Sequence, residues 1–242
     1  MKDISGQNVP QVGFKNRFEN EWQELSYEEI FKDKKVVIFS LPGAFTPTCS
    51  GSHLPRYEEL YGVMKENGVD EVYCISVNDG FVMDSWREAQ KIQNVNLLAD
   101  GNGDFTEGMG MLVDKANLGF GKRSWRYSMV VTNGVVEKMF IEADVEGDPF
   151  DVSDADTMLA YVAPEVKAPA DVLVFSKPTC PFCKKAKALL TEKGLAYEEI
   201  SVGGDGVAAR ALKAVSGAQT VPQVFIDGKL IGGSEALEAY FA

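Results

Sequence analysis

The sequence predicts an α/β protein of two domains, each with a central mixed β-sheet flanked by helices. Three observations lead to this prediction. Apolar, β-branched runs alternate with helix-compatible stretches along the chain. Each of the two series includes a hairpin, expected at residues 127–141 and 223–231. A stretch with two prolines and no apolar periodicity separates them. We therefore expect domains at residues 1–163 and 171–242, joined by a linker at 164–170.

The first series passes from a buried strand through strand–helix units to a hairpin. In chain order we expect a strand at 35–40, a helix at 50–66, a strand at 72–77, a helix at 84–91, a strand at 95–99, and hairpin strands at 127–132 and 135–141. Asp84 is a plausible N-cap of its helix. The Asn133-Gly134 dipeptide favours the tight turn of the hairpin.

The second series repeats this order of elements without repeating the sequence. We expect a strand at 171–176, a helix at 181–193, a strand at 196–202, a helix at 207–216, hairpin strands at 223–226 and 229–231, and a last helix capped by Ser234. Gly194 and Gly217 end the first two of these helices. Glu198 and Glu199 are read as the solvated face of a strand.

Charge and composition narrow the functional classes. The net charge is −12, and all of the excess acid lies in residues 1–169, because residues 170–242 hold eight basic and eight acidic residues. Neither part has a net basic face, which argues against nucleic acid or an anionic membrane as partner. No apolar run approaches the ~20 residues of a membrane span, and residues 1–7 lack the apolar core of a secretory signal. We expect a cytoplasmic protein, where cysteines are catalytic or metal-binding rather than structural.

The first candidate site is the segment Pro42-Gly-Ala-Phe-Thr46-Pro-Thr-Cys49. A cysteine attacks only as thiolate, and a free thiol, with a pKa of ~8.5, is mostly protonated at neutral pH. Cys49 lies at the predicted start of a helix, where backbone amides and the helix dipole favour negative charge. The Thr46 hydroxyl can reach the sulfur or a bound oxygen, and Pro42 and Pro47 stiffen the loop.

This segment resembles the active-site motif of the peroxiredoxins, and its residues are most similar to those of the type-5 subfamily. The resemblance extends over about residues 1–162. The resemblance implies a thioredoxin-like fold and a peroxidase acting on hydrogen peroxide and organic hydroperoxides. Cys49 would be the peroxidatic cysteine, in a pocket shaped by Pro42, Thr46 and Arg126. It also implies self-association as a homodimer or larger assembly such as a tetramer.

Two further residues near this motif allow more than one interpretation. His53 is the only histidine and lies one helical turn beyond Cys49, so it either approaches the sulfur or is a bonded structural residue. A lone histidine does not make a metal site. Cys74 is flanked by strand residues and is expected in the core. Since residues 75–179 hold no cysteine, no resolving cysteine is available in this domain unless Cys74 serves, which departs from the two-cysteine type-5 enzymes.

The second candidate site is Cys180-Pro181-Phe182-Cys183, at the start of a predicted helix. The pair could be half of a zinc site, but zinc needs four ligands and nothing supplies the other two, so we expect redox chemistry and no metal. Cys180, nearer the helix N-terminus, would be the exposed nucleophile, and Cys183 its buried partner. Lys177 adds positive charge nearby.

Residues 170–242 resemble a glutaredoxin, through this motif, the Thr220-Val221-Pro222 segment and the Gly232-Gly233-Ser234 segment. The resemblance implies that Pro222 is cis, that the Val221 backbone pairs with glutathione, and that Gly233 and Ser234 receive a glutathione carboxylate. Phe182 stands where many relatives carry Tyr. The implied glutathione-binding residues are Lys177, Phe182, Thr220, Val221, Pro222, Gly233 and Ser234.

Together the two resemblances imply a peroxiredoxin fused to a glutaredoxin that acts as a glutathione-dependent peroxidase. Glutathione would be a reducing cosubstrate, with no permanently bound cofactor. Cys49 would be recycled either by glutathione and then Cys180, or by Cys180 directly. A seven-residue linker with prolines reaches about 22 Å, which leaves transfer within one chain or between subunits open.

Three alternative functions compete with this reading. One is a deglutathionylase or disulfide reductase whose first domain only docks partners, against which the intact Cys49 motif argues. Another is a holdase, for which no feature of the sequence speaks. The third is an iron–sulfur carrier using Cys180, where cluster-binding relatives usually have Gly at the position of Pro181.

Overall fold

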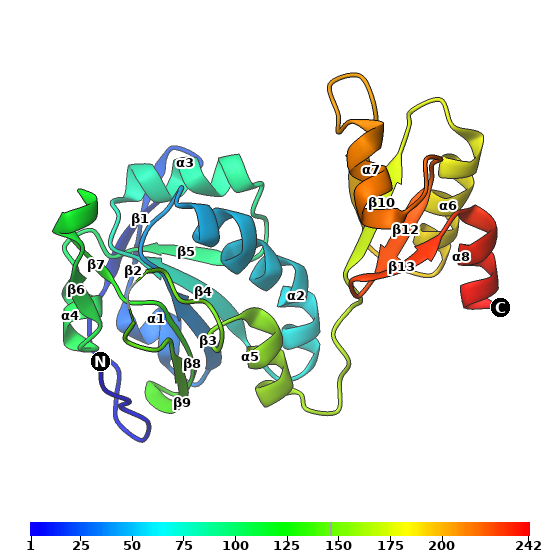
Figure 1. Cartoon of the computed structure of the whole chain (residues 1–242). Coiled ribbons are helices and arrows are strands. Elements are labelled where there is room, and N and C mark those ends of the chain that lie inside the picture. Colours follow the sequence, from blue (N-terminus) through cyan, green and yellow to red (C-terminus); the bar gives the residue numbers. More distant parts are fainter. Residues whose placement is uncertain (146) are drawn as a thin grey trace. The chain divides into compact units, whose positions relative to one another are not determined.

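The computed structural model describes residues 1–145 and 147–242, and it divides into two compact units, residues 1–168 and 169–242 (Figure 1). Each unit has its own mixed β-sheet and its own hydrophobic core. The predicted fold class, two α/β domains with mixed sheets flanked by helices, is confirmed.

The expected linker, residues 164–170, spans the division between the units, and three of its seven residues pack against one core or the other. Val166 and Ala168 lie against the core of the first unit, and Ala170 lies against the core of the second. Apolar contacts on both sides restrict these residues. The division between the units falls within this expected linker, between Ala168 and Pro169.

The first unit is built on a five-stranded sheet of order β5-β4-β3-β8-β9, in which β3, β4 and β5 are parallel and β8 and β9 antiparallel to their neighbours. The whole unit, with two further two-stranded sheets, contains the strands β1 (Phe14–Phe18), β2 (Glu21–Leu25), β3 (Lys35–Ser40), β4 (Glu71–Ser76), β5 (Asn96–Ala99), β6 (Leu112–Asp114), β7 (Lys122–Ser124), β8 (Tyr127–Thr132) and β9 (Val135–Ile141). Its helices are α1 (Tyr27–Phe31), the π-helical turn η1 (Cys49–His53), α2 (Leu54–Glu66), α3 (Gly80–Gln90), α4 (Asp104–Gly108), the 3-10 turn η2 (Ala116–Leu118) and α5 (Ala155–Val162).

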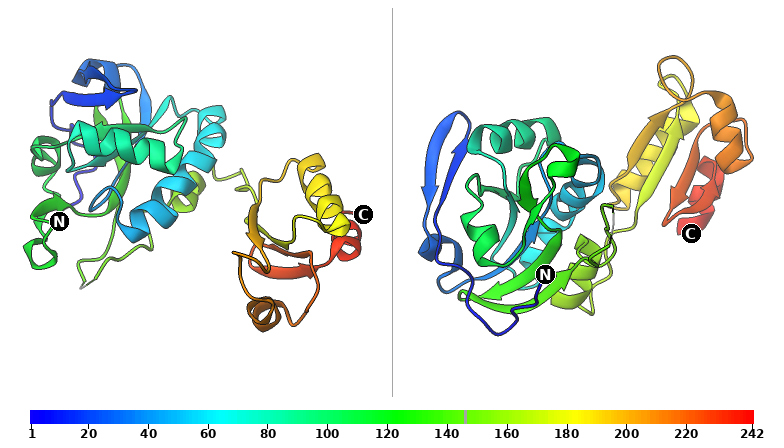
Figure 2. Two further views of the ribbon diagram at one scale, coloured as in Figure 1. Left: turned by 90° about the horizontal axis from the view of Figure 1, so that it is seen from above. Right: turned by 60° about the vertical axis from the view of Figure 1, so that its left-hand side comes forward.

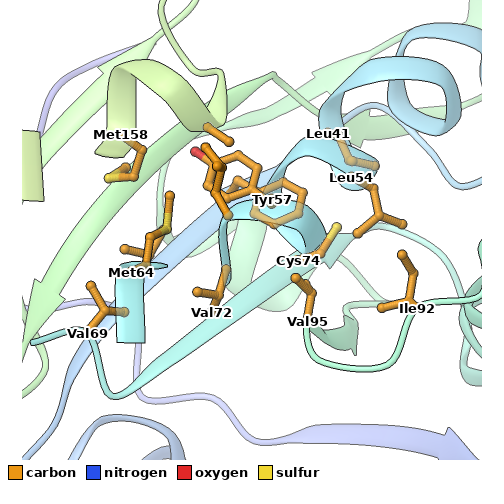
Figure 3. Close-up of a cluster of buried hydrophobic side chains, with 14 of the residues drawn as sticks. Leu41, Leu54, Tyr57, Met64, Val69, Val72, Cys74, Ile92, Val95 and Met158 are labelled. Atoms are coloured by element: carbon orange, nitrogen blue, oxygen red, sulfur yellow. The ribbon is translucent and has the colours of Figure 1, made fainter. Parts of the chain in front are cut away.

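Both faces of this sheet are covered, which explains why β3 is apolar throughout. Val37 and Phe39 point into the cluster formed with α2, α3 and α5, part of which is shown in Figure 3. Val36 and Ile38 point into a second cluster with α1 and α4. Successive side chains of a strand alternate between faces, so a strand buried on both sides needs a continuous apolar run.

The predicted hairpin of this unit is confirmed at its expected bounds, as β8 and β9. Asn133 and Gly134 both have positive φ, 48° and 79°, as the tight turn requires. The prediction that Asp84 caps a helix is wrong. The helix α3 begins earlier, with Asp79 as N-cap accepting the Val82 amide, and Asp84 is buried inside it, paired with arginines.

Several elements of the first unit had no counterpart in the prediction. The β1–β2 hairpin lies beside α3 (Figure 2), where Trp22 and Phe81 meet edge to face with ring centroids 5.3 Å apart. The helices α1, α4 and α5 and the small β6–β7 sheet were also not expected. These segments are short, and several are rich in charged residues.

The second unit has a four-stranded mixed sheet of order β11-β10-β12-β13. Its elements are β10 (Val172–Ser176), α6 (Pro181–Glu192), β11 (Glu198–Ser201), α7 (Ala209–Ser216), β12 (Gln223–Ile226), β13 (Lys229–Gly232) and α8 (Ser234–Phe241). All of its predicted elements are present. The N-cap of α8 is Gly233, so the prediction that Ser234 caps this helix is wrong. Glu199 is more than a solvated side chain, since it accepts hydrogen bonds from Ser176 and Lys187.

Among the described residues, none of the helices combines the length and the apolar character that crossing a membrane requires.

Candidate active site

Cys49 lies at the end of a tight loop that follows β3. The Thr46 hydroxyl donates to the Gly43 carbonyl at 2.8 Å, which closes the loop on itself. The Asn78 side chain accepts the Ala44 amide at 3.0 Å, which ties the loop to the end of β4. These bonds fix where the chain enters η1, and so they fix the position of the Cys49 sulfur.

The turn that carries Cys49 is π-helical rather than α-helical. The Leu54 amide bonds to the Cys49 carbonyl, one residue further than in an α-helix. Pro55, in the first turn of α2, has no N–H to donate into this turn. Cys49 and His53 are both completely buried here. The predicted placement of Cys49 at the start of a helical segment is confirmed.

Arg126 is the cation that faces the sulfur. It lies between β7 and β8 and is 1% exposed. Its Nη1 is 3.6 Å from Cys49 Sγ and 3.1 Å from His53 Nδ1, and its Nη2 pairs with the carboxylate of Asp148. A buried guanidinium this close favours the thiolate form of a cysteine. Within the described residues, the buried Nε–H of Arg126 has no hydrogen-bond partner.

His53 joins this group in one defined tautomer. Arginine only donates, so His53 Nδ1 must accept from Arg126. The proton therefore sits on Nε2, which donates to the Ser153 carbonyl at 3.1 Å. Burial, and then the charge of Arg126, lower the pKa of His53 to about 3, so the ring is neutral near pH 7. His53 is therefore a fully bonded structural histidine, and it shares Arg126 Nη1 with the Cys49 sulfur.

The partner of His53 is held by a buried carboxylate after β9. Glu142 Oε1 accepts the amides of three successive residues, Asp151 to Ser153, at 2.8–2.9 Å, and the Ser153 hydroxyl at 2.7 Å. Burial opposes the charge of Glu142, but these hydrogen bonds outweigh it and lower the pKa of the carboxyl. The anchored turn presents the Ser153 carbonyl to His53 and to the Tyr57 hydroxyl.

Sequence reasoning missed Asp148, Glu142 and Asn78. For Asn78 a signal was available, because polar residues at the carboxyl end of a buried strand often serve a site. Asp148 and Glu142 lie on or beside a long connection between β9 and α5, where nothing in the sequence shows which carboxylate turns inward.

Cys74 is in the core, as predicted, on β4 beside Phe39 of β3. Figure 3 shows it among Tyr57, Leu54 and Val95. Burial, and then the charge of Cys49, hold the pKa of its thiol well above the usual range. A thiol in this state stays protonated and has little nucleophilic character.

The second pair of cysteines opens α6. Cys180 is its N-cap, half-buried, with Sγ accepting the Cys183 amide at 3.2 Å and donating to the Val221 carbonyl at 3.6 Å. Cys183 is fully buried. Burial, and then its hydrogen bond with Cys180, raise the pKa of Cys183 to about 11. The predicted contrast between an accessible Cys180 and a buried Cys183 agrees with this geometry.

The residues predicted to bind glutathione differ in their exposure and in the contacts that hold them. The Val221–Pro222 bond is cis, as predicted. Gly233 lies beside it, since a Cβ added there would be 3.8 Å from the Pro222 carbonyl oxygen. The side chains of Lys177, Phe182 and Thr220 are exposed and free to meet a ligand, and Ser234 is the first residue of α8.

The described part of the chain holds no group of three or more His, Cys, Asp or Glu side chains able to bind a metal ion.

Comparison with known proteins matches each of the two units to a protein family. The Redoxin family matches residues 4–159, and the Glutaredoxin family matches residues 172–231. The chain is 59% identical to a hybrid peroxiredoxin of Haemophilus influenzae, hyPrx5, over the full length of both proteins. It is also 53% identical to a peroxiredoxin of Synechocystis over 188 residues, which cover 71% of this chain and all of the relative.

Solved structures agree for the first unit. Reduced Prx3 of Vibrio vulnificus in complex with H2O2 is 42% identical, with a TM-score of 0.62, covering 66% of this chain and 99% of that one. The 1-Cys peroxiredoxin of Plasmodium falciparum is 36% identical, with a TM-score of 0.62, covering 68% of this chain and all of that one.

Proposed function

The chain belongs to the Redoxin family, as a peroxiredoxin with a C-terminal glutaredoxin domain, and from this premise we propose a glutathione-driven peroxidase cycle. It is a peroxidase and a thiol oxidoreductase. The proposed substrates are hydrogen peroxide and alkyl hydroperoxides, and the proposed reductant is glutathione, acting in the cytoplasm. Residues 164–170 are the proposed linker between the peroxidase part and the glutaredoxin part.

In the first step the Cys49 thiolate attacks one peroxide oxygen and the O–O bond breaks. Cys49 is oxidised to sulfenic acid, the peroxide is reduced, and one proton from solvent completes the departing water, or alcohol for an alkyl hydroperoxide. The observation that carries this assignment is the position of Arg126, whose Nη1 faces Cys49 Sγ at 3.6 Å while its buried Nε–H has no partner in the described residues. Such a donor suits the negative charge that develops on oxygen. Thr46 and Pro42 would complete this pocket.

In the second step the sulfenic acid condenses with glutathione and releases water, which leaves Cys49 as a mixed disulfide. The Cys180 thiolate then attacks the glutathione sulfur, which frees the Cys49 thiolate and moves glutathione onto Cys180. A second glutathione thiolate releases oxidised glutathione and restores Cys180. Lys177, Phe182, Thr220, Val221, Pro222, Gly233 and Ser234 are the proposed glutathione contacts.

A direct route would use Cys183 as well. Cys180 would condense with the Cys49 sulfenic acid, releasing water, and Cys183 would then displace Cys49 to leave a Cys180–Cys183 disulfide for two glutathiones to reduce. The raised pKa of Cys183 makes it a poor attacking group until a base takes its proton, which favours the first route.

The test is NADPH consumption with hydrogen peroxide, glutathione and glutathione reductase, beside a matched assay with thioredoxin and its reductase. We expect turnover with glutathione, its loss in Cys49→Ser and in Cys180→Ser, and substantial retention in Cys183→Ser. The control is Cys74→Ala, which removes a protonated core thiol and should keep turnover.

Turnover with thioredoxin alone would overturn the glutathione cycle. Equal losses in Cys180→Ser and Cys183→Ser would reject the first route in favour of the direct one. We also propose self-association as a homodimer or tetramer, with Cys49 and Cys180 exchanging between subunits. If Cys49→Ser and Cys180→Ser proteins exchange subunits but recover no activity when mixed, transfer runs within one chain.

A further inference from the structure

Asp148 binds one terminal nitrogen of the Arg126 guanidinium, and Cys49 faces the other. Nη1 is committed to Cys49 Sγ and His53 Nδ1, and Nη2 donates to the Asp148 carboxylate. The Arg126 side chain is 1% exposed, but the Asp148 side chain is 44% exposed. The carboxylate therefore reaches the buried cation from the solvent side of the site.

Asp148 is the only carboxylate in direct contact with Arg126 among the described residues. The other titratable groups around Cys49 are His53 on η1, Cys74 on β4 and, behind His53, Tyr57 on α2. Burial keeps all three neutral, because it lowers the pKa of His53 and raises those of Cys74 and Tyr57. The charges around the pocket are therefore those of Arg126, Asp148 and the cysteine itself, with the Glu142 carboxylate further out behind Ser153.

We propose that Asp148 is a positioning residue for the reaction of Cys49 with peroxide. It holds the planar guanidinium by its outer edge, so that Nη1 faces the sulfur and the Nε–H stays turned to the place where a peroxide oxygen would bind. The inference rests on the proposed function, and it assigns to this loop residue a part in the same site. A guanidinium held at both Nη groups has one orientation in its plane, whereas one held only at Nη1 can swing about that edge.

The same carboxylate has a second, opposing effect, since its negative charge offsets part of the cation that favours the Cys49 thiolate. Position and charge can be separated by substitution. Asp148→Asn keeps an oxygen that accepts from Nη2 but removes the charge. Asp148→Ala removes both the acceptor and the charge.

The experiment follows a single turnover in the full-length chain with Cys180→Ser and Cys183→Ser as background, so that Cys49 is the reactive thiol. Hydrogen peroxide is mixed in a stopped-flow instrument and tryptophan fluorescence is recorded, since Trp86 donates to Ser50 Oγ beside Cys49 at 3.0 Å. Near-ultraviolet circular dichroism checks that each variant is folded.

We expect the rate constant for oxidation of Cys49 to fall at least tenfold in Asp148→Ala and to stay within about threefold of the parent in Asp148→Asn. The matched control is Asp144→Ala, which removes an exposed carboxylate from the same loop and should leave this rate constant unchanged.

An Asp148→Ala variant that reacts as fast as its parent would overturn the proposal, and so would an Asp148→Asn variant as slow as Asp148→Ala. If the parent itself does not react with hydrogen peroxide, the proposed function fails instead, so the two failures are distinguishable.

Discussion

His53 acts as a neutral hydrogen-bond relay, which accepts from Arg126 on one ring nitrogen and donates to the Ser153 carbonyl from the other. This role has a cost at acid pH. The pKa of His53 is about 3 in the folded protein, whereas an unfolded histidine has a pKa near 6.5. Between these values the unfolded chain carries a proton that the folded chain does not. Stability therefore falls as the pH drops from about 6.5 toward 3, by about 1.4 kcal/mol per pH unit from this residue.

The variant His53→Gln tests this, because glutamine can accept from Arg126 and donate to Ser153 but does not titrate. Between pH 7 and pH 5 we expect the free energy of unfolding of the first unit to drop by about 2 kcal/mol more in the wild type than in the variant. Urea unfolding followed by tryptophan fluorescence measures it, since Trp22, Trp86 and Trp125 all belong to that unit. Parallel pH profiles would show that His53 is already charged or exposed.

At the scale of single residues, the positions of Cys49 and Cys180 at the start of helical segments were predictable, and the residues that support them were not. Cys49 and Cys180 lie in short motifs whose spacing carries the chemistry. Asp148 and Glu142 act through a fold that brings the β9–α5 connection against η1, and this depends on contacts far apart in the chain. The sequence therefore points to the candidate nucleophiles, whereas the charged residues around them come only from the structure.

At the scale of elements, the Asn133-Gly134 turn joins the two strands that complete the larger sheet. Gly134 has φ of 79°, and an added Cβ would lie 2.0 Å from the Tyr27 hydroxyl. We expect Gly134→Ala to destabilise the first unit by about 2–3 kcal/mol, because it combines backbone strain with a clash.

Gly68→Ala is the matched control, since Gly68 has φ of 88° but no atom within 4 Å of an added Cβ. It should cost only about 1 kcal/mol, from backbone strain alone. Thermal unfolding followed by tryptophan fluorescence compares the two. Equal losses would mean that Tyr27 moves aside without cost.

The elements that the sequence predicted share one property, which is a strong apolar period or a clear turn. The strand β3 and the hairpin β8–β9 are such cases. The strand β2, Glu-Trp-Gln-Glu-Leu, is mostly exposed and has no buried face for a pattern to show. The start of α3 was misplaced because Asn78-Asp79-Gly80 resembles a turn, whereas Asp79 caps the helix and Gly80 begins it.

At the scale of the whole molecule, two units with separate cores are joined near Pro169. Residues 1–168 and 169–242 should each fold when made separately, because each buries its own apolar cluster. The first piece should still react with hydrogen peroxide and the second should still reduce glutathione mixed disulfides.

What the separated pieces should lose is the high effective concentration that a tether provides, commonly in the millimolar range. With the pieces mixed at equal micromolar concentrations, we expect glutathione-dependent turnover to fall several-fold and to rise with concentration, while the intact chain keeps a constant specific activity. The NADPH-coupled assay over a dilution series measures this. Equal turnover by the pieces at all dilutions would mean that glutathione alone recycles Cys49.

The two thiols proposed to react differ in burial, since Cys49 has no exposed surface and Cys180 is half-buried. A peroxide is small enough to reach a buried thiol with little movement of the protein, whereas a drug-sized electrophile needs an exposed one. Such toxicants would therefore attack the glutaredoxin thiol first and leave the peroxide-reacting thiol intact. An enzyme modified at Cys180 would still reduce one equivalent of peroxide and would then stop. An inhibitor of this kind would therefore block the recycling of Cys49 rather than its reaction with peroxide.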